Sequence, residues 1–109
     1  MVSPHWGTEY KLAASESQKT IAHQFIDAGA DIIIGTHPHV IQGPEGTPEI
    51  YKGKNIYYSL GNFIFDQYFD ENVRNSLGVT IKIDKNTKQL EFSEKRFYLD
   101  KNGQTILLQ

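Results

Sequence analysis

The stretch that decides the fold of this 109-residue chain is Ala28-Gly29-Ala30-Asp31-Ile32-Ile33-Ile34-Gly35-Thr36-His37-Pro38-His39. Its consecutive isoleucines, bounded by Asp31 and Gly35, are typical of a short strand that is buried on both faces of a parallel sheet. Gly29 is placed to end a preceding helix in the left-handed region. We therefore predict a helix followed by a buried strand, with histidines directly after the strand.

The predicted helix occupies the residues before Gly29. Ser15 or Ser17 can cap its N-terminus. Its apolar residues recur at helical spacing, so they fall on one face, which we expect to pack against the sheet. These residues are Ile21, Ala22, Phe25, Ile26 and Ala28.

A second strand is predicted at the start of the chain. If residues 1–4 are the end of a strand, residues 1–35 form a right-handed βαβ unit with parallel strands. The carboxyl ends of these strands then share one sheet edge, where open α/β sheets place ligand sites. His5 follows the first strand, and His37 and His39 follow the second. We expect the three imidazoles to converge on one crevice.

The histidines point to a divalent metal. In an extended segment alternate side chains point the same way, so His37 and His39 can face one site. Imidazole binds zinc, iron, manganese or nickel, and carboxylates such as Glu9 or Asp66 can complete the shell. For His5 a ligand role and a plain structural role both stay open.

Other residues near these motifs have simpler interpretations. His23, on the polar side of the helix, is expected to be a surface or hydrogen-bonded residue. Trp6 is expected to cover the core edge, and Gly7 to permit a tight turn. Tyr57, Tyr58 and Tyr68 are expected to be half-buried packing residues.

A second dense motif is Ser59-Leu60-Gly61-Asn62-Phe63-Ile64-Phe65-Asp66, which follows a further predicted strand. Asn62 either orients a metal ligand by hydrogen bonds or forms an Asx turn. Asp66 either lines the same edge or is a surface carboxylate. Phe63 and Phe65 are expected to pack.

The remaining segments complete an α/β fold of mixed-sheet (α+β) type in one domain, with the βαβ unit followed by antiparallel hairpins. The predicted segments are a long loop at 37–54 with a short extended piece near 49–51, a strand at 55–60, a hairpin of 76–83 and 89–97, a turn at 100–103 and a last strand at 105–108.

Composition excludes several classes of protein. The net charge is −2, and the basic residues are scattered, which argues against a nucleic-acid partner. There is no cysteine, so thiolate ligands are excluded, and no apolar run is long enough for a membrane segment. Without a Ser-His-Asp order, a phosphate-cradling glycine loop or a His-Glu-x-x-His helix, metal-assisted hydrolysis remains the natural enzyme class.

In three separate stretches the chain resembles the CapA family of capsule and poly-γ-glutamate synthesis proteins, within the calcineurin-like metallophosphoesterase superfamily. The stretches are residues 5–10, 28–42 and 58–67. The resemblance implies that His5 is an isolated metal histidine and that His37 and His39 are the closing His-x-His pair of a two-metal site. Glu9, Asn62 and Asp66 match motif positions as possible site-lining residues, without an implied ligand role.

The resemblance also implies what the chain lacks. In the superfamily, earlier strands supply an Asp, a further Asp or Glu and an Asn-His, and this chain starts after them. We therefore expect residues 1–109 to be the C-terminal part of a larger domain, with an incomplete metal centre and no turnover of its own. The missing half of the sheet would leave a strand edge exposed, which predicts self-association or a segment swap.

The implied function of the parent is metal-dependent hydrolysis or transfer, with Mn, Zn or Fe, at a phosphoryl or amide-like centre. Its implied partner is an anionic cell-envelope polymer or a precursor, handled in the envelope or on the extracellular side. Two alternatives stay open: a non-catalytic polymer-handling or assembly subunit on the same scaffold, and a fragment with no function of its own.

Overall fold

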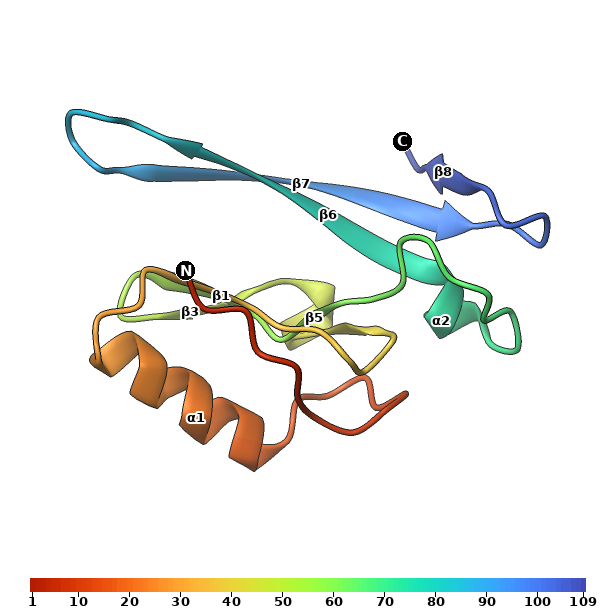
Figure 1. The fold of residues 1–109 in the computed structure, drawn as a ribbon, viewed down its shortest axis with the longest axis horizontal. Coiled ribbons are helices and arrows are strands. Elements are labelled where there is room, and N and C mark those ends of the chain that lie inside the picture. The colour runs from red at the N-terminus through yellow and green to blue at the C-terminus, as the bar shows by residue number, and fades with distance from the viewer.

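The computed structural model describes residues 1–109 and places a helix and a small mixed sheet beneath a twisted antiparallel sheet (Figure 1). In the mixed sheet, β1 pairs in parallel with β4, which pairs antiparallel with β3. The elements are α1 (Glu16–Asp27), β1 (Ile32–Ile34), β2 (Ile41–Gln42), a 3-10 turn (Pro44–Gly46), β3 (Glu49–Tyr51), β4 (Lys54–Tyr57), β5 (Ser59–Leu60), α2 (Glu71–Arg74), β6 (Asn75–Ile83), β7 (Leu90–Leu99) and β8 (Thr105–Leu107).

The predicted βαβ unit is present. The backbone N–H of Val2 donates to the carbonyl of Ile32, and that of Ile34 donates to the carbonyl of Val2, both at 3.0 Å. Residues 1–4 thus run parallel to β1 on the side away from β4. The outer side of this segment is a sheet edge, and self-association through that edge stays a prediction.

Local sequence sets both ends of α1. The Ser15 hydroxyl accepts from the Gln18 N–H, and the Gln18 side chain accepts from the Ser15 N–H, which together form a capping box. Gly29 has φ of 107°, as expected for a left-handed residue after a helix.

The apolar face predicted for α1 is only partly buried. Ala22 and Ile26 are buried, whereas Ile21 and Phe25 remain 38% and 36% exposed. The third buried position of the helix is Gln18, whose amide donates to Gln42 at 2.9 Å. The helix therefore contacts the sheet through a narrow stripe of residues four apart, which leaves its flank in solvent.

The predicted loop at 37–54 contains more structure than expected, because β2 forms within it and pairs with β5. The predicted strand at 55–60 is correspondingly divided into β4 and β5, which pair with different partners. Tyr57 and Tyr58 lie at this division and are both fully buried, so the half-buried prediction was wrong for them. Tyr58 packs on the α1 side of the sheet and Tyr57 on the β6 side.

The second half of the chain forms the predicted hairpins. β6 pairs with β7 over its whole length, and β7 pairs with β8. The short helix α2 was not predicted; Asp70 caps it by accepting from the Asn72 N–H. Gly61, directly after β5, bridges to Ser76 of β6, which links the two-stranded β2–β5 sheet to the β6–β7–β8 sheet. Neither helix has the length and hydrophobicity that crossing a bilayer requires.

Candidate metal centre

The two segments that carry histidines leave the sheet at one edge. The Thr36 N–H donates to the Pro4 carbonyl at 2.9 Å, and the Trp6 N–H donates to the Thr36 carbonyl at 3.1 Å. His5 therefore lies opposite Thr36, one residue before His37. The topological prediction that these histidines meet at one edge is confirmed.

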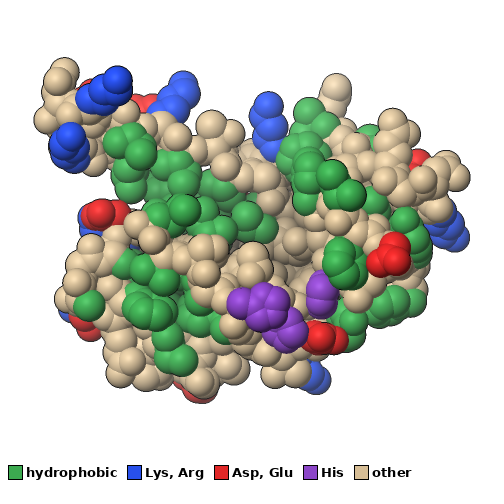
Figure 2. Space-filling view, in the orientation of Figure 1, with side chains coloured by type: hydrophobic (Ala, Val, Ile, Leu, Met, Phe, Trp, Pro, Cys, Tyr) green, Lys and Arg blue, Asp and Glu red, His purple; other side chains and the backbone are tan.

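The three imidazoles lie along this edge in the order His5, His37, His39. The ring centroids of His5 and His37 are 4.4 Å apart, and those of His37 and His39 are 5.9 Å apart. Figure 2 shows histidine side chains gathered on one face of the molecule, with an acidic side chain beside them.

The backbone that brings His37 and His39 together differs from the extended segment we expected. Their φ angles are 102° and 62°, in the left-handed region that side chains other than glycine rarely adopt. The Tyr10 N–H donates to the Pro38 carbonyl at 2.8 Å between them. The rings converge because the chain turns twice, not because alternate side chains of a strand share a face. Strained residues of this kind cost on the order of 1 kcal/mol each and gather at functional sites.

The turn brings a carboxylate to the histidines. Ligand atoms of Glu9, His37 and His39 all lie within 4.8 Å of one another. His5 stands outside this group and packs on the ring of His37. Two imidazoles and a carboxylate are a donor set that suits Zn²⁺, Mn²⁺ or Fe²⁺, so these residues fit the divalent metal that the sequence predicts.

Asn62 fixes the orientation of His39. Its side-chain N–H₂ donates to the Val73 carbonyl at 3.1 Å and to Gln67 at 3.0 Å. Its carboxamide oxygen lies 2.9 Å from His39 Nδ1 and can only accept, so Nδ1 carries the proton. Nε2 of His39 then keeps a free lone pair for a ligand. Of the two roles left open for Asn62, the structure supports orientation of His39.

Asp66 is exposed and does not join the cluster. Its neighbour Phe65 lies against the His39 ring, with centroids 5.1 Å apart, while Phe63 meets the edge of Phe97. Both phenylalanines stay more than two-fifths exposed, so they pack on one side only.

Tyr10 is a site residue that sequence reasoning missed. Its ring stacks on His39 at 5.8 Å, and its hydroxyl accepts from Gln67 at 2.9 Å. A buried amide anchors the segment that carries Glu9 and Tyr10. The side-chain N–H of Gln42 donates to the Lys11 carbonyl at 2.7 Å. A polar side chain on an irregular segment gives no periodic signal, which is why the pattern of the sequence did not identify it.

Trp6 packs against Tyr58, and two glycines near it occupy positions that favour glycine. The Trp6 indole N–H donates to the Tyr58 carbonyl at 2.9 Å, and its ring stacks on Tyr58. A Cβ on Gly35 would lie 2.2 Å from the same carbonyl oxygen, so only glycine fits there. Gly7 has φ of 84°, which confirms the predicted tight turn.

His23 lies outside the cluster, as expected for a hydrogen-bonded residue. Its Nε2 is 2.5 Å from Glu49, and its ring stacks on Tyr51 at 3.9 Å. Glu49 also accepts from the Tyr58 hydroxyl at 2.7 Å. Although burial acts to raise the pKa of Glu49, the hydrogen bonds from Tyr58 and His23 hold it below the usual 4.5. Burial and the neighbouring Glu49 raise the pKa of Tyr58.

The fold and the site together define a class: an α/β protein whose parallel strands deliver histidines and a carboxylate to one sheet edge as a candidate metal centre. A sequence model of the family "Bacterial capsule synthesis protein PGA_cap" matches residues 1–67. The chain belongs to this family.

Curated relatives match the same region. The chain is 51% identical to the capsule biosynthesis protein CapA of Bacillus anthracis over 67 residues. These residues make up 62% of this chain and 15% of that protein. Identity to the PGA biosynthesis protein CapA of Bacillus subtilis is 49%, over 62% of this chain and 17% of that protein. A probable polyglutamine synthesis accessory protein of Mycobacterium tuberculosis is 38% identical over 61% of this chain and 16% of its own length. The chain thus matches less than a fifth of each of these relatives.

Proposed function

We propose that this chain supplies a histidine and carboxylate ligand set for a divalent metal in a capsule-synthesis protein. The reaction we propose is hydrolysis or transfer at a phosphoryl or amide-like centre of an anionic envelope polymer or its precursor. The names of the relatives support the connection with capsule and polymer synthesis. The observation that carries the metal part is the meeting of Glu9, His37 and His39 within 4.8 Å.

Each residue of the cluster has a defined part in this proposal. His39 offers Nε2, because Asn62 holds the proton on Nδ1. Glu9 adds the negative charge that a divalent cation favours. His5, which packs on His37, is proposed as a further ligand at the rim. A bound divalent ion supplies Lewis-acid polarisation and lowers the pKa of a bound water.

The supporting contacts limit how the cluster can move. Tyr10 and Phe65 contact the His39 ring, and the Tyr10 N–H is bonded to the Pro38 carbonyl. A site held by packing and hydrogen bonds loses less entropy on binding a ligand than a mobile loop does.

Titration calorimetry of the metal-free chain with Mn²⁺ and Zn²⁺ tests the proposal. We expect stoichiometric binding that is lost in His37→Ala and in His39→Ala, because each change removes a ligand. His23→Ala is the matched control, since His23 lies outside the cluster, and it should bind like the wild type. Equal binding by all variants would contradict the proposed ligand set. No binding by the wild type would mean that the site needs residues outside this chain, or that the protein is the non-catalytic polymer-handling subunit.

A further inference from the structure

Tyr10 is an exposed aromatic residue that its neighbours hold on several sides. Its ring stacks on His39, with centroids 5.8 Å apart, and forms a T-shaped contact with Phe69 at 5.2 Å. Its backbone N–H donates to the Pro38 carbonyl at 2.8 Å, and its φ of 65° lies in the left-handed region. Yet 41% of the residue is exposed to solvent. A residue that is strained, firmly held and exposed is typical of a functional site rather than of a core.

The hydrogen bonds that lead from Val73 to Tyr10 each have a fixed direction. The Val73 carbonyl can only accept, so it faces the side-chain N–H₂ of Asn62 at 3.1 Å. The second N–H of that amide donates at 3.0 Å to the carboxamide oxygen of Gln67. This arrangement turns the Gln67 N–H₂ to the Tyr10 hydroxyl at 2.9 Å, where the phenolic oxygen accepts. Each bond therefore sets the direction of the next one.

The phenolic proton of Tyr10 has no acceptor within the protein. A hydroxyl that accepts from an amide keeps its own proton for a different partner. The only hydrogen bond of the Tyr10 hydroxyl is the one that it accepts. In contrast, the hydroxyls of Tyr51, Tyr57, Tyr58 and Tyr98 each donate to a carboxylate. The proton of Tyr10 is thus available to a bound molecule.

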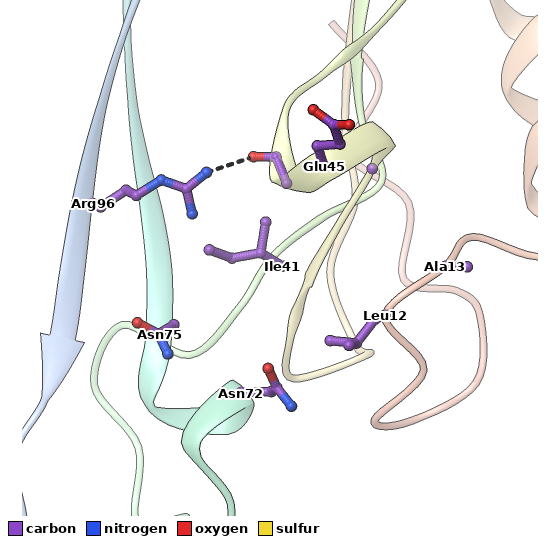
Figure 3. Close-up of a pocket in the computed structure, with 9 residues that line it drawn as sticks. Leu12, Ala13, Ile41, Glu45, Asn72, Asn75 and Arg96 are labelled. Atoms are coloured by element: carbon purple, nitrogen blue, oxygen red, sulfur yellow. Dashed lines mark hydrogen bonds between the residues drawn. The ribbon is translucent and has the colours of Figure 1, made fainter.

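Contacts place this proton beside the histidines. A hollow of about 590 Å³ near the 3-10 turn is a separate feature, lined by Leu12 and by Arg96 of β7 among others (Figure 3). Neither Tyr10 nor any histidine lines that hollow. Tyr10 instead contacts His39 and directly follows Glu9, a member of the cluster. A molecule that reaches the Tyr10 hydroxyl therefore lies next to the candidate metal centre.

We propose that Tyr10 is a further ligand-binding residue of this centre and donates its phenolic proton to a negatively charged oxygen of the bound molecule. Gln67 is the positioning residue that directs this proton. A hydrogen bond to a charged oxygen is stronger than one to a neutral oxygen. The bond from Gln67 favours hydroxyl orientations that point away from it, so less rotational freedom is lost when the ligand binds. The place of the ligand at the metal rests on the proposed function.

The hydrogen bond between Gln67 and Tyr10 can be tested without a metal or a ligand. In NMR spectra of the metal-free protein, Tyr10→Phe should shift the side-chain N–H₂ signals of Gln67, because their acceptor is lost while the ring remains. Tyr68→Phe is the matched control, since the Tyr68 hydroxyl lies near Gly103 and away from Gln67, and it should leave these signals in place. Unmoved Gln67 signals in Tyr10→Phe would overturn the positioning role.

Inorganic phosphate is the probe for the donor role, with its affinity measured by calorimetry with and without saturating Mn²⁺. We expect phosphate to bind the Mn²⁺-loaded wild type. Tyr10→Phe should weaken this binding by about tenfold or more, because a hydrogen bond to a charged oxygen is lost. Tyr68→Phe should bind phosphate like the wild type.

Gln67→Glu separates the direction of the proton from a plain effect of charge. A carboxylate only accepts, so the Tyr10 hydroxyl would donate to it and withdraw its proton from the ligand. Phosphate binding should fall by about tenfold or more in this variant. The loss should be much smaller when Gln67→Glu is added to Tyr10→Phe, which has no proton to withdraw. Equal losses in both backgrounds would overturn the role of Gln67, because the added charge alone would explain them.

Contrary results at the ligand and at the metal have different meanings. Phosphate that binds Tyr10→Phe as tightly as the wild type would overturn the donor role. The same holds if phosphate binds the wild type neither with Mn²⁺ nor without it. A wild type that binds phosphate through Tyr10 but takes up no Mn²⁺ would leave this inference intact and count only against the proposed metal site.

Discussion

Residues 1–67 and residues 70–109 differ in how far apart along the chain their paired strands lie. In the first region the pairings join distant segments, such as Val2 with Ile33 and Ile32 with Asn55. In the second region each strand pairs with the next one along the chain. The family match covers the first region. The candidate metal centre depends on these distant pairings, and the second region contacts its supporting residues through the bond from Asn62 to the Val73 carbonyl.

Backbone conformation sharpens the contrast. Tyr10, His37 and His39 are non-glycine residues with positive φ that cluster at the candidate centre. The second region has one such residue, Lys88, in the turn between β6 and β7. Strain at the centre of the first region is held by tertiary contacts, whereas the turn of the second region is held by local hydrogen bonds to Asp84. The two regions still cooperate, because the Val73 carbonyl bonds Asn62 and Arg96 bonds the Gly46 carbonyl.

The largest expected effect compares one substitution in both regions. A Cβ at Gly35 would meet the Tyr58 carbonyl oxygen at 2.2 Å, whereas one at Gly78 would meet the Phe97 ring at 2.7 Å. Backbone cannot yield as a side chain can, so we expect Gly35→Ala to lower the free energy of unfolding by about 3 kcal/mol or more and Gly78→Ala by about 1 kcal/mol. Urea denaturation measures both values. Equal losses would remove the distinction between a rigid and an adaptable region.

A smaller effect concerns the orientation of His39. Asn62→Ala removes the acceptor for Nδ1–H and should weaken Zn²⁺ binding by about 10 to 100-fold. Asn86→Ala, in the turn of the second region, is the matched control, because the Asn86 side chain makes no hydrogen bond. Calorimetry gives both affinities. An unchanged affinity in Asn62→Ala would show that His39 needs no orienting partner.

A pH-dependent effect is expected on the far side of the first region. Because the pKa of Glu49 is held below 4.5 in the folded chain, its hydrogen bonds contribute stability above that value. The contribution is lost as the pH falls through the folded pKa. Glu49→Gln should therefore cost less than about 1 kcal/mol at pH 7, because the site is partly in solvent, and progressively less as the pH falls through the folded pKa of Glu49. Denaturation curves across this range measure the difference, which a pH-independent loss would contradict.

The smallest effect is expected in the β6–β7 turn. Lys88 has φ of 62°, which costs a side chain more than it costs glycine. Lys88→Gly should change stability by less than about 1 kcal/mol, because relief of strain is offset by the larger entropy of the unfolded chain. Thermal unfolding checks this value. A large loss would mean that the turn, and not only the first region, is fixed by its surroundings.

The sequence predicted most of the fold because most of its elements are determined by residues close together in the chain. The capping box at Ser15, Gly29 after the helix and the isoleucines of β1 each act within a few residues, and the period of two in β6 and β7 is equally local. The division of β4 from β5 and the pairing of β2 depend on distant partners, so no short pattern encodes them. The narrow buried stripe of α1 likewise depends on Gln42, a residue far along the chain.

The sequence predicted which histidines meet at the candidate centre better than it predicted how they are arranged there. Parallel topology was enough to bring His5, His37 and His39 to one edge. The left-handed turns, the stacking of Tyr10 and the approach of Glu9 arise from tertiary hydrogen bonds. Those contacts decide that Glu9, and not Asp66, stands with the histidine pair.

Long-range ¹H–¹⁵N NMR of the imidazoles, recorded while Zn²⁺ is added, tests most directly that His37 and His39 form a ligand pair oriented by Asn62. We predict that Zn²⁺ shifts the Nε2 signal of His39 and a ring nitrogen of His37. His39 Nδ1 should stay protonated by its bond to Asn62, and the signals of His23 should not move. A shift at His39 Nδ1, or shifts at His23 as large as those at His39, would contradict the account.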